Sequence, residues 1–307
     1  MTLIWDKIGH IYAPDGKKEW MSSHASNTVP IHRGRGVFRV YFSSRDLEGR
    51  SSISFVDIDV GSGEFEVVAE ATSPVLSPGL PGFFDESGVS LSCIKEINGR
   101  MLMYYLGWTL GKTVPWYNSI GVAELSPSGD VATKLFNAPI YSRSESDPIS
   151  LSYPYFIEIN GENFVYYGSN RAWGGSTLDM DHVLKIGTTV DGLSITPKDK
   201  IAIIPNQGEY AFSRPYVFRN SRGTWSMYYS YRGEMYRIGY AESEDGLEWN
   251  RMDEHAGIAP SESGWDSEMI CYPCLFEYEG RRYMSYNGNG YGKSGFGIAV
   301  ESFSILP

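Results

Sequence analysis

The chain repeats one sequence pattern five times. In each copy a polar or acidic turn leads into an apolar segment, and a tight turn then leads into an aromatic segment. Aligned on the proline of the apolar segment or its equivalent, the copies fall at Pro30, Ser92, Pro154, Pro215 and Pro273, which are 62, 62, 61 and 58 residues apart. So regular a period indicates that one supersecondary unit recurs along the chain.

Each copy predicts three or four β-strands. It contains short alternating or apolar runs separated by turns, and no stretch shows a sustained helical period. Four turns carry dipeptides typical of tight hairpins: Asn98–Gly99, Asn160–Gly161, Asp191–Gly192 and Asp245–Gly246. A unit of about sixty residues with three or four strands has the size of a propeller blade. The sequence therefore predicts an all-β fold, a five-bladed β-propeller with blades of about four antiparallel strands, as a single domain over residues 1–307.

We expect the inner strands of the five blades to enter near residues 24–32, 85–95, 147–157, 209–219 and 266–276. The N-terminal segment that ends in Ala13–Pro14 resembles the end of another copy, Ala138–Pro139–Ile140–Tyr141. We therefore expect it to close the last blade as its outer strand, which would cover an edge prone to aggregation. A β-sandwich or a β-helix is the alternative. A sandwich does not predict five copies, and the rungs of a β-helix are far shorter.

Composition and net charge argue for some classes of binding partner and against others. Aromatic residues make up 14% of the chain, which is typical of sugar-binding surfaces but also of β-sheets in general. The net charge is −11 and no block of Lys or Arg occurs, which argues against nucleic acid and anionic membranes. The N-terminus lacks the apolar core of a signal peptide, and no run approaches the ~20 apolar residues of a membrane span. These features predict a soluble, cytoplasmic protein.

The three cysteines predict buried thiols. Cys271 and Cys274 form a C-x-x-C in a strand context, Cys93 stands alone, and no second pair completes a zinc site. No metal site and no cofactor are predicted, although a structural ion in the central channel stays open.

Acidic residues recur at one register of the repeat. Equivalent positions of a propeller become neighbours around the mouth of its channel, so side chains shortly before the aligned proline should converge. Seven positions before it stand Ser23, Asp85, Asp147, Gly208 and Asp266, six before it His24, Glu86, Pro148, Glu209 and Ser267, and five before it in the last copy Glu268. Clustered acids raise one another's pKa, and glycoside cleavage needs one protonated and one ionised carboxyl. A single Asp at such a place can equally cap the turn.

These features resemble the five-bladed β-propeller glycosidase superfamily, which includes arabinanases, β-xylosidases, invertase-like enzymes and mannoside phosphorylases. The resemblance covers nearly the whole chain at the level of the blade pattern, with Asp147–Pro148 echoing an Asp-Pro dipeptide of these enzymes. It implies catalytic roles for Asp85 as base, Asp147 as the group that tunes and positions, and Glu209 as acid. Copy one carries His24 and Asn27 and no aligned acid, although the base of that family lies on the first blade.

Ten further residues are candidates for substrate binding. Arg45, Arg214 and Arg232 suit a phosphate or a sugar carboxylate, because a guanidinium offers bidentate contacts. Trp108, like Trp116 and Trp173, can stack on a sugar or pack in the core. The substrate-binding set is His24, Arg45, Glu86, Trp108, Asn170, Arg214, Arg232, Asp266, Glu268 and Asn287.

The first interpretation is thus a carbohydrate-active enzyme that acts on a glycosidic bond by hydrolysis, phosphorolysis or transfer, with carboxylates at the channel mouth. Its partner would be a small saccharide or glycoconjugate, with phosphate as an open option. The alternative is a non-catalytic glycan-binding or scaffold propeller. A propeller that binds other proteins is a third reading.

Overall fold

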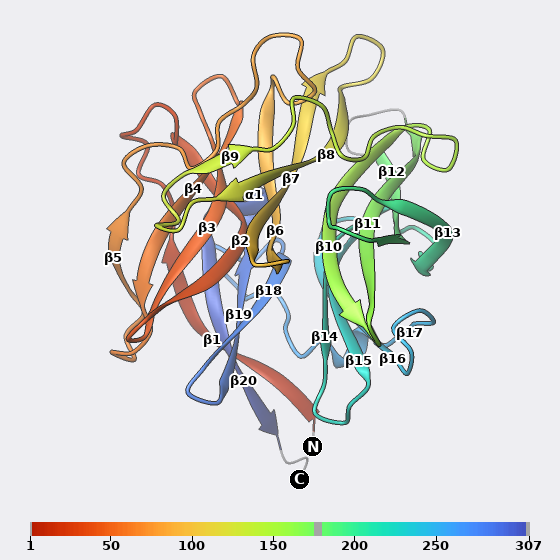
Figure 1. Cartoon of the computed structure of the whole chain (residues 1–307). Helices are drawn as coiled ribbons and strands as arrows, with labels where there is room; N and C mark the ends of the chain where they lie inside the picture. Colours follow the sequence, from red (N-terminus) through yellow and green to blue (C-terminus); the bar gives the residue numbers. More distant parts are fainter. Residues whose placement is uncertain (1, 175–179, 305–307) are drawn as a thin grey trace.

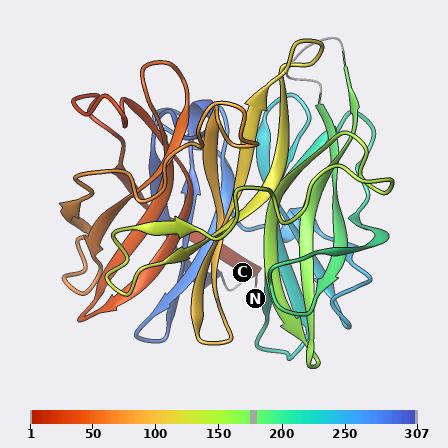
Figure 2. The same ribbon diagram turned by 45° about the horizontal axis from the view of Figure 1, so that its top comes forward.

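The computed structural model describes residues 2–174 and 180–304, in which β-strands predominate and helix is almost absent. The strands form antiparallel groups of four around a central axis (Figures 1 and 2), and single parallel bridges, Ser51–Gly88 and His182–Ala211, join two pairs of these groups into eight-stranded sheets. In the part of the chain that is described, no helix is long and apolar enough to cross a membrane.

The four-stranded units follow the sequence repeat. Unit one holds β2 (Ser23–Gly34), β3 (Val37–Arg45), β4 (Ser51–Asp59) and β5 (Glu66–Glu70). Unit two holds β6 (Gly88–Ile97), β7 (Arg100–Leu110), β8 (Trp116–Leu125) and β9 (Ala132–Lys134). Unit three holds β10 (Ser150–Ile159), β11 (Glu162–Trp173), β12 (Met180–Thr189) and β13 (Thr196–Ile203). Unit four holds β14 (Ala211–Arg219), β15 (Trp225–Arg232), β16 (Tyr236–Ser243) and β17 (Asn250–Arg251), followed by a 3-10 turn at Asp253–His255.

Unit five joins the two ends of the chain. It holds β18 (Cys271–Tyr278), β19 (Arg281–Asn287) and β20 (Phe296–Ser304), with the single helical turn α1 (Asn289–Gly292) between the last two. The N-terminal strand β1 (Thr2–Tyr12) pairs antiparallel with β20, so Thr2 lies beside Ser304 (Figure 1). The N-terminal strand therefore pairs where the sequence predicted, at the outer edge of the last unit.

The first strands of the units surround the axis. Each of β2, β6, β10, β14 and β18 contacts the next one in the series, and β18 contacts β2. Side chains link neighbouring strands of this ring: the Ser92 hydroxyl donates to the Pro154 carbonyl at 2.6 Å, and the Tyr216 hydroxyl donates to the Leu275 carbonyl at 2.9 Å. We call these five strands the inner strands.

Paired aromatic residues on the second strands hold neighbouring units together. Tyr104 is fully buried, stacks on Phe156 at 3.8 Å and donates to the Gly192 carbonyl of the next unit at 2.9 Å. Tyr41 makes the same bond to Gly129, at 2.8 Å. Both glycines have a positive φ, and a Cβ there would lie 2.5 Å from the tyrosine oxygen. The turn therefore requires glycine, and much of the aromatic excess serves the core.

The three cysteines are free and buried, as predicted.

Candidate functional site

A wide cavity opens at the N-terminal ends of the inner strands. Its volume is about 420 Å³, and side chains from all five units line it. Six aromatic side chains dominate the wall: Trp108, Trp116, Tyr153, Tyr236, Tyr272 and Tyr291. Its main polar groups are Arg45, Asn118, His182 and Arg232. Among the described residues, no Asp or Glu belongs to this lining. We call it the large cavity.

Strand bulges aim two tyrosines into the large cavity. Tyr153 and Tyr272 each precede a proline, have a positive φ and sit where the pairing of the inner strand with its neighbour shifts register. A bulge beside proline redirects one side chain and ends the regular ladder. The two rings lie 6.0 Å apart, and the Asn27 side-chain amide donates to the Tyr153 hydroxyl at 3.3 Å. They thus form a polar aromatic floor.

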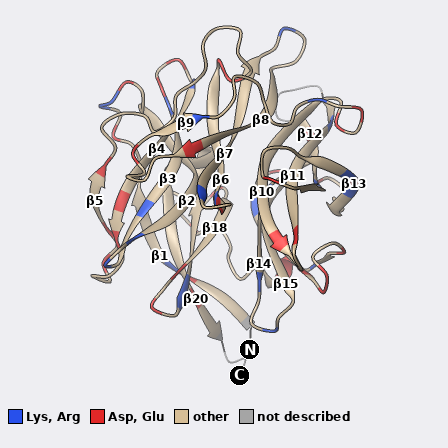
Figure 3. Ribbon diagram, in the orientation of Figure 1, with Lys and Arg blue, Asp and Glu red and all other residues tan. Residues whose placement is uncertain are grey.

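Two arginines give the large cavity a positive charge. Neither Arg45 nor Arg232 has a carboxylate ion-pair partner among the residues that the structure describes. Arg232 is buried among aromatic rings and donates to the Tyr291 hydroxyl, and its buried Nε has no partner within the described ranges. Charged residues of both signs are scattered along the rest of the ribbon (Figure 3). In a chain of net charge −11, this cavity is a locally cationic site.

His182 supplies a buried acceptor. Burial, opposed by a hydrogen bond to the Phe212 backbone, lowers the pKa of His182 from 6.5 to about 4, so the ring is neutral at pH 7. No described residue forms a hydrogen bond with its buried Nδ1. Since the other ring nitrogen interacts with the backbone, Nδ1 is free to accept a hydrogen bond from a ligand hydroxyl.

The recurring aspartates are internal cross-links of their own units. Each is buried, accepts a hydrogen bond from a tyrosine of the second strand, and pairs with a lysine of an outer or third strand of its unit. The three sets are Asp85 with Tyr105 (3.2 Å) and Lys134 (2.6 Å), Asp147 with Tyr167 (2.9 Å) and Lys185 (3.1 Å), and Asp266 with Tyr286 (3.0 Å) and Lys7 (2.7 Å). The structure therefore places Asp85, Asp147 and Asp266 in separate units, outside the lining of the large cavity.

These contacts decide the charge of the acids. Burial alone would raise the pKa of Asp147, but hydrogen bonds from Ser169, Tyr141 and Lys185 bring it below its usual value. The pKa of Asp266 is lowered in the same way by Lys7, against the effect of burial. The expectation that neighbouring acids raise one another's pKa is not met at these two carboxyls, because each faces a cation.

Glu209 is held by a different cation. Both its carboxylate oxygens pair with Arg251, at 2.5 and 2.7 Å. Burial would raise the pKa of Glu209, but the Arg251 bonds lower it overall. A carboxyl with a lowered pKa is a poor proton donor near neutral pH. Arg251 also binds Asp253, which accepts the Tyr229 hydroxyl at 2.6 Å and so replaces the aspartate that unit four lacks at Gly208.

In unit one the aspartate–tyrosine pair is replaced by apolar residues. Strand pairing sets Ser23 opposite Arg45 and Gly88 opposite Trp108. The residue equivalent to Asp85 is therefore Trp20, three positions before Ser23. The predicted equivalence with Ser23 was wrong for two reasons. β2 contains one more register shift before Val29 than β6 contains before Cys93, and Val29 pairs with Tyr41 where Cys93 pairs with Tyr104, so Pro30 lies two positions beyond the residue equivalent to Ser92. Trp20 packs against the cluster that contains Phe42, which stands where the other units have tyrosine.

The other predicted site residues divide between the cavity and structural positions. Trp108 lines the large cavity and donates to the Ser51 hydroxyl at 2.9 Å. Glu86 binds the Gly82 backbone, and Glu268 is exposed. Asn287 cross-links three backbone groups, those of Asn27, Ala25 and Gly295.

Three predicted residues lie close to the large cavity without being part of its lining. Asn170 is buried, and neither polar atom of its side chain has a hydrogen-bond partner in the part of the chain that is described. Burial, Arg45 and Lys293 lower the pKa of His24 to about 4. Arg214 fills the channel beneath the tyrosine floor, with its guanidinium 5.8 Å from the Tyr153 ring.

Sequence reasoning missed several cavity residues. His182, Tyr236 and Tyr291 come from third strands and from α1, whose register the repeat does not specify. Tyr153 and Tyr272 had a signal, since both directly precede the aligned proline. In the described part of the chain, no group of three or more His, Cys, Asp or Glu side chains is placed to hold a metal ion.

Two mycobacterial proteins are similar to the chain over its whole length. "Uncharacterized protein Rv1502" of Mycobacterium tuberculosis (strain H37Rv) is 42% identical over 301 residues, which cover 97% of this chain and 99% of that protein. "Uncharacterized protein MT1551" of the CDC 1551 strain matches with the same identity and coverage. The chain belongs to the family of these proteins. No protein-family model matches it.

Solved structures share the fold at low sequence identity. One described as "Glycoside hydrolase" has a TM-score of 0.73 and 14% identity, covering 99% of this chain and 93% of that protein. A GH130 structure, from work on mannoside phosphorylases and glycoside hydrolases that target β-1,2 mannosidic linkages in Candida mannan, has a TM-score of 0.69 and 15% identity, covering 98% and 94%. The endo-arabinase of Bacteroides thetaiotaomicron has a TM-score of 0.63 and 13% identity, covering 97% and 98%. The chain thus has the fold of the propeller glycosidase superfamily, which confirms the resemblance stated from the sequence.

Proposed function

We propose that the protein is a carbohydrate-active enzyme that acts on the glycosidic bond of a small saccharide bearing an anionic group such as phosphate. The observation that carries this proposal is the large cavity itself: an aromatic wall and, within the described residues, two arginines without carboxylate partners and a lining without Asp or Glu. Aromatic faces suit the apolar faces of sugar rings, and guanidinium groups suit phosphate. We further propose that the four-stranded units are the blades of one five-bladed propeller domain over residues 1–307.

The charge of the cavity bears on the type of reaction. Hydrolysis of an ordinary glycoside uses two carboxyls flanking the bond, whereas Asp85, Asp147 and Glu209 are each engaged by a cation elsewhere. A phosphate leaving group departs as a stable anion and needs no general acid, and a phosphate nucleophile needs no general base. Each reaction still needs one proton transfer, to the departing sugar oxygen in phosphorolysis or from the acceptor hydroxyl in transfer from a sugar phosphate, and hydrolysis of an ordinary glycoside needs two. Transfer or phosphorolysis therefore fits this cavity better than hydrolysis does.

Calorimetric titration tests the proposal. We expect hexose 1-phosphates to bind more tightly than the matching free hexoses, and Arg232→Gln to weaken the sugar phosphates about tenfold or more, since a hydrogen bond between charged groups is worth about 1.5–3 kcal/mol. The free hexoses should be unaffected. The exposed Arg281→Gln is the matched control. Equal binding of charged and uncharged sugars would refute the role of the arginines.

A second function is a glycan-binding protein without catalysis, which the absence of described carboxylates from the cavity lining favours. Incubation of the protein with each sugar that binds, with and without inorganic phosphate, separates the two. Release of free sugar or transfer to an acceptor supports the enzyme, and binding without turnover supports the alternative. Turnover that survives both Asp85→Asn and Glu209→Gln would show that the acids implied by the resemblance are not the catalytic groups.

A further inference from the structure

A second, smaller cavity lies at the opposite end of the inner strands. Its volume is about 120 Å³, well above the ~10–15 Å³ that one water needs. All five inner strands contribute to its wall. On two of them the chamber residues lie two positions beyond a residue of the large cavity: Tyr155 after Tyr153, and Cys274 after Tyr272. Arg214 lies between the two spaces. We call this cavity the small chamber.

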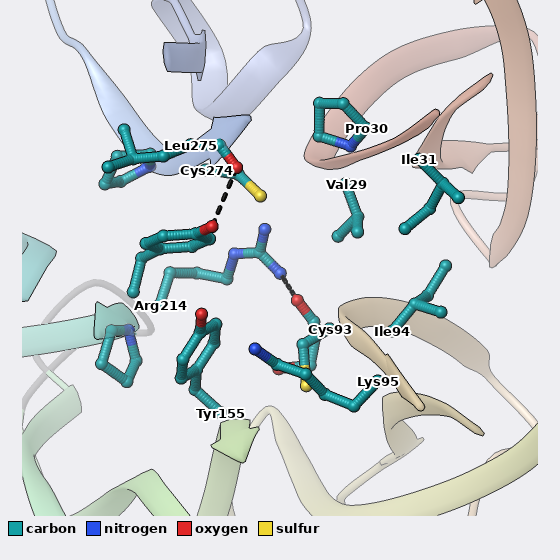
Figure 4. Close-up of a pocket in the computed structure, with 14 residues that line it drawn as sticks. Val29, Pro30, Ile31, Cys93, Ile94, Lys95, Tyr155, Arg214, Cys274 and Leu275 are labelled. Carbon is teal, nitrogen blue, oxygen red and sulfur yellow. Dashed lines mark hydrogen bonds between the residues drawn. The ribbon is translucent and has the colours of Figure 1, made fainter. Parts of the chain in front are cut away.

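Two cations extend into the small chamber (Figure 4). The Arg214 side chain is 4% exposed and donates to the backbone carbonyls of Leu91 (3.0 Å), Ser92 and Thr28 (3.1 Å). These bonds use three of the five N–H donors of a guanidinium and leave two. The Lys95 ammonium lies 3.8 Å from the centre of the Tyr155 ring. Within the described residues, neither cation has a carboxylate partner, and no Asp or Glu lines the chamber.

The remaining polar side chains of the chamber stay neutral at pH 7. Burial raises the pKa of the Cys93 thiol and of the Cys274 thiol to about 11, although nearby Lys95 and Arg214 act to lower both values. Burial also raises the pKa of Tyr155 and of Tyr216 well above the usual value. The described lining of the chamber therefore contains no negative charge to offset the two cations. Backbone carbonyls orient Arg214 without neutralising it.

An uncompensated charge in a confined site is unfavourable, and two like charges in one concave site add their fields. A counter-charge from solution would relieve both. We propose that the small chamber binds one small inorganic anion, such as chloride or phosphate, between Lys95 and Arg214. The anion would connect the inner strands of units two and four across the channel. This proposal is independent of the proposed function, because it concerns the other end of the channel.

Thermal unfolding at constant ionic strength tests the proposal, with sodium gluconate as the balancing salt because gluconate is too large for the chamber. A ligand that binds only the folded state raises the unfolding midpoint in a saturable way. We expect chloride or phosphate, titrated in separate arms, to do so for the wild type. Lys95→Met should weaken the apparent affinity about tenfold or more, since it removes a charge-assisted contact. The exposed Lys112→Gln is the matched control and should leave the affinity unchanged.

Arg232→Gln separates the small chamber from the large cavity. If the anion effect persists in Arg232→Gln and is lost in Lys95→Met, the chamber is the site. If it is lost in Arg232→Gln and persists in Lys95→Met, the anion binds in the large cavity and the proposal is wrong. The proposal also fails if neither anion stabilises the wild type beyond gluconate. Anomalous scattering from crystals grown with bromide gives a direct readout, with a peak expected beside the Lys95 ammonium.

Discussion

Replacing Asp147 by Asn should strongly destabilise the protein. The carboxylate is fully buried and receives the Tyr141 hydroxyl at 2.5 Å, the Tyr167 hydroxyl at 2.9 Å and the Lys185 ammonium at 3.1 Å. Removing one partner of a buried ion pair costs about 3–5 kcal/mol. The Asn oxygen can still accept a tyrosine hydroxyl, so we expect about 3 kcal/mol, which is a large part of the roughly 5–15 kcal/mol that stabilises a typical protein.

The matched control is Asp199→Asn. Asp199 is the second acid near Lys185, at 3.6 Å, but its side chain is 66% exposed. Exposed ion pairs are worth about 0–1 kcal/mol, so this variant should unfold close to the wild type. Urea unfolding at pH 7, followed by intrinsic fluorescence, measures both variants. A cost below about 1 kcal/mol for Asp147→Asn, or equal costs for the two variants, would refute the cross-link.

The pH dependence gives an independent readout of the same contact. The pKa of Asp147 in the folded protein lies below its usual value of 3.8, so its contribution is complete above pH 3.8 and is lost as pH falls through the lower folded value. Below pH 4 the wild type should therefore lose stability more steeply than Asp147→Asn. A catalytic role for Asp147 without a structural one predicts the reverse pattern, in which turnover disappears while the unfolding curves coincide at every pH.

Three further outcomes follow from the structure. The pKa of His182 is lowered from 6.5 to about 4, and that of His24 likewise, so the unfolded chain binds more protons and stability should fall as pH drops from 6.5 to 4. Each shift corresponds to about 3 kcal/mol at most, and His182→Gln should remove about half of this decline in urea titrations. Tyr105→Phe should cost about 1–3 kcal/mol of unfolding free energy, because Asp85 keeps its lysine but loses a buried donor. Trp116→Ala should weaken charged and uncharged sugars alike by about tenfold in calorimetry, in contrast to the arginine variants.

The fold could be predicted because its signals are local. Tight turns and apolar runs recur along the copies, and the first four copies each form one four-stranded antiparallel unit, whereas the last copy forms three strands and takes β1 as its fourth. The partner of β1 was also visible, since its end resembles the end of another copy. The register of unit one could not be predicted from the sequence. The register of β2 against β3 shifts between Ser23 and Ser26 and again between Ser26 and Val29. Counting residues from Pro30 cannot detect these shifts.

The sequence indicated the tyrosine partners of the acids but not their lysine partners. Tyr105 and Tyr167 are each the second residue of a Tyr-Tyr pair, whereas Tyr286 follows Ser285. In unit one, which lacks the acid, the equivalent residue is Phe42. The lysines lie on weak outer or third strands at variable distances, so their approach depends on sheet pairing. The aligned aspartates therefore suggested one group of acids around the mouth of the channel. In the structure each aspartate is instead bound by a tyrosine and a lysine of its own unit. The attraction between each carboxylate and the lysine beside it is stronger than any interaction among the acids across the channel.

The distribution of aspartates and arginines among the units explains why the large cavity is positive. Units two, three and five each bury an aspartate at the repeated position, whereas units one and four have Trp20 and Gly208 there. Those two units end their second strands with the cavity arginines, at one register: Arg45 lies opposite Ser23, and Arg232 opposite Ala211.

Units one and four both neighbour unit five in the ring of inner strands, while the cavity tryptophans come from unit two. The large cavity is therefore cationic on the side of unit five and rich in tryptophan on the side of unit two. Under the proposed function, an anionic group would bind on the side of unit five, where Tyr291 accepts a hydrogen bond from Arg232, and a sugar ring attached to it would extend toward Trp108 and Trp116.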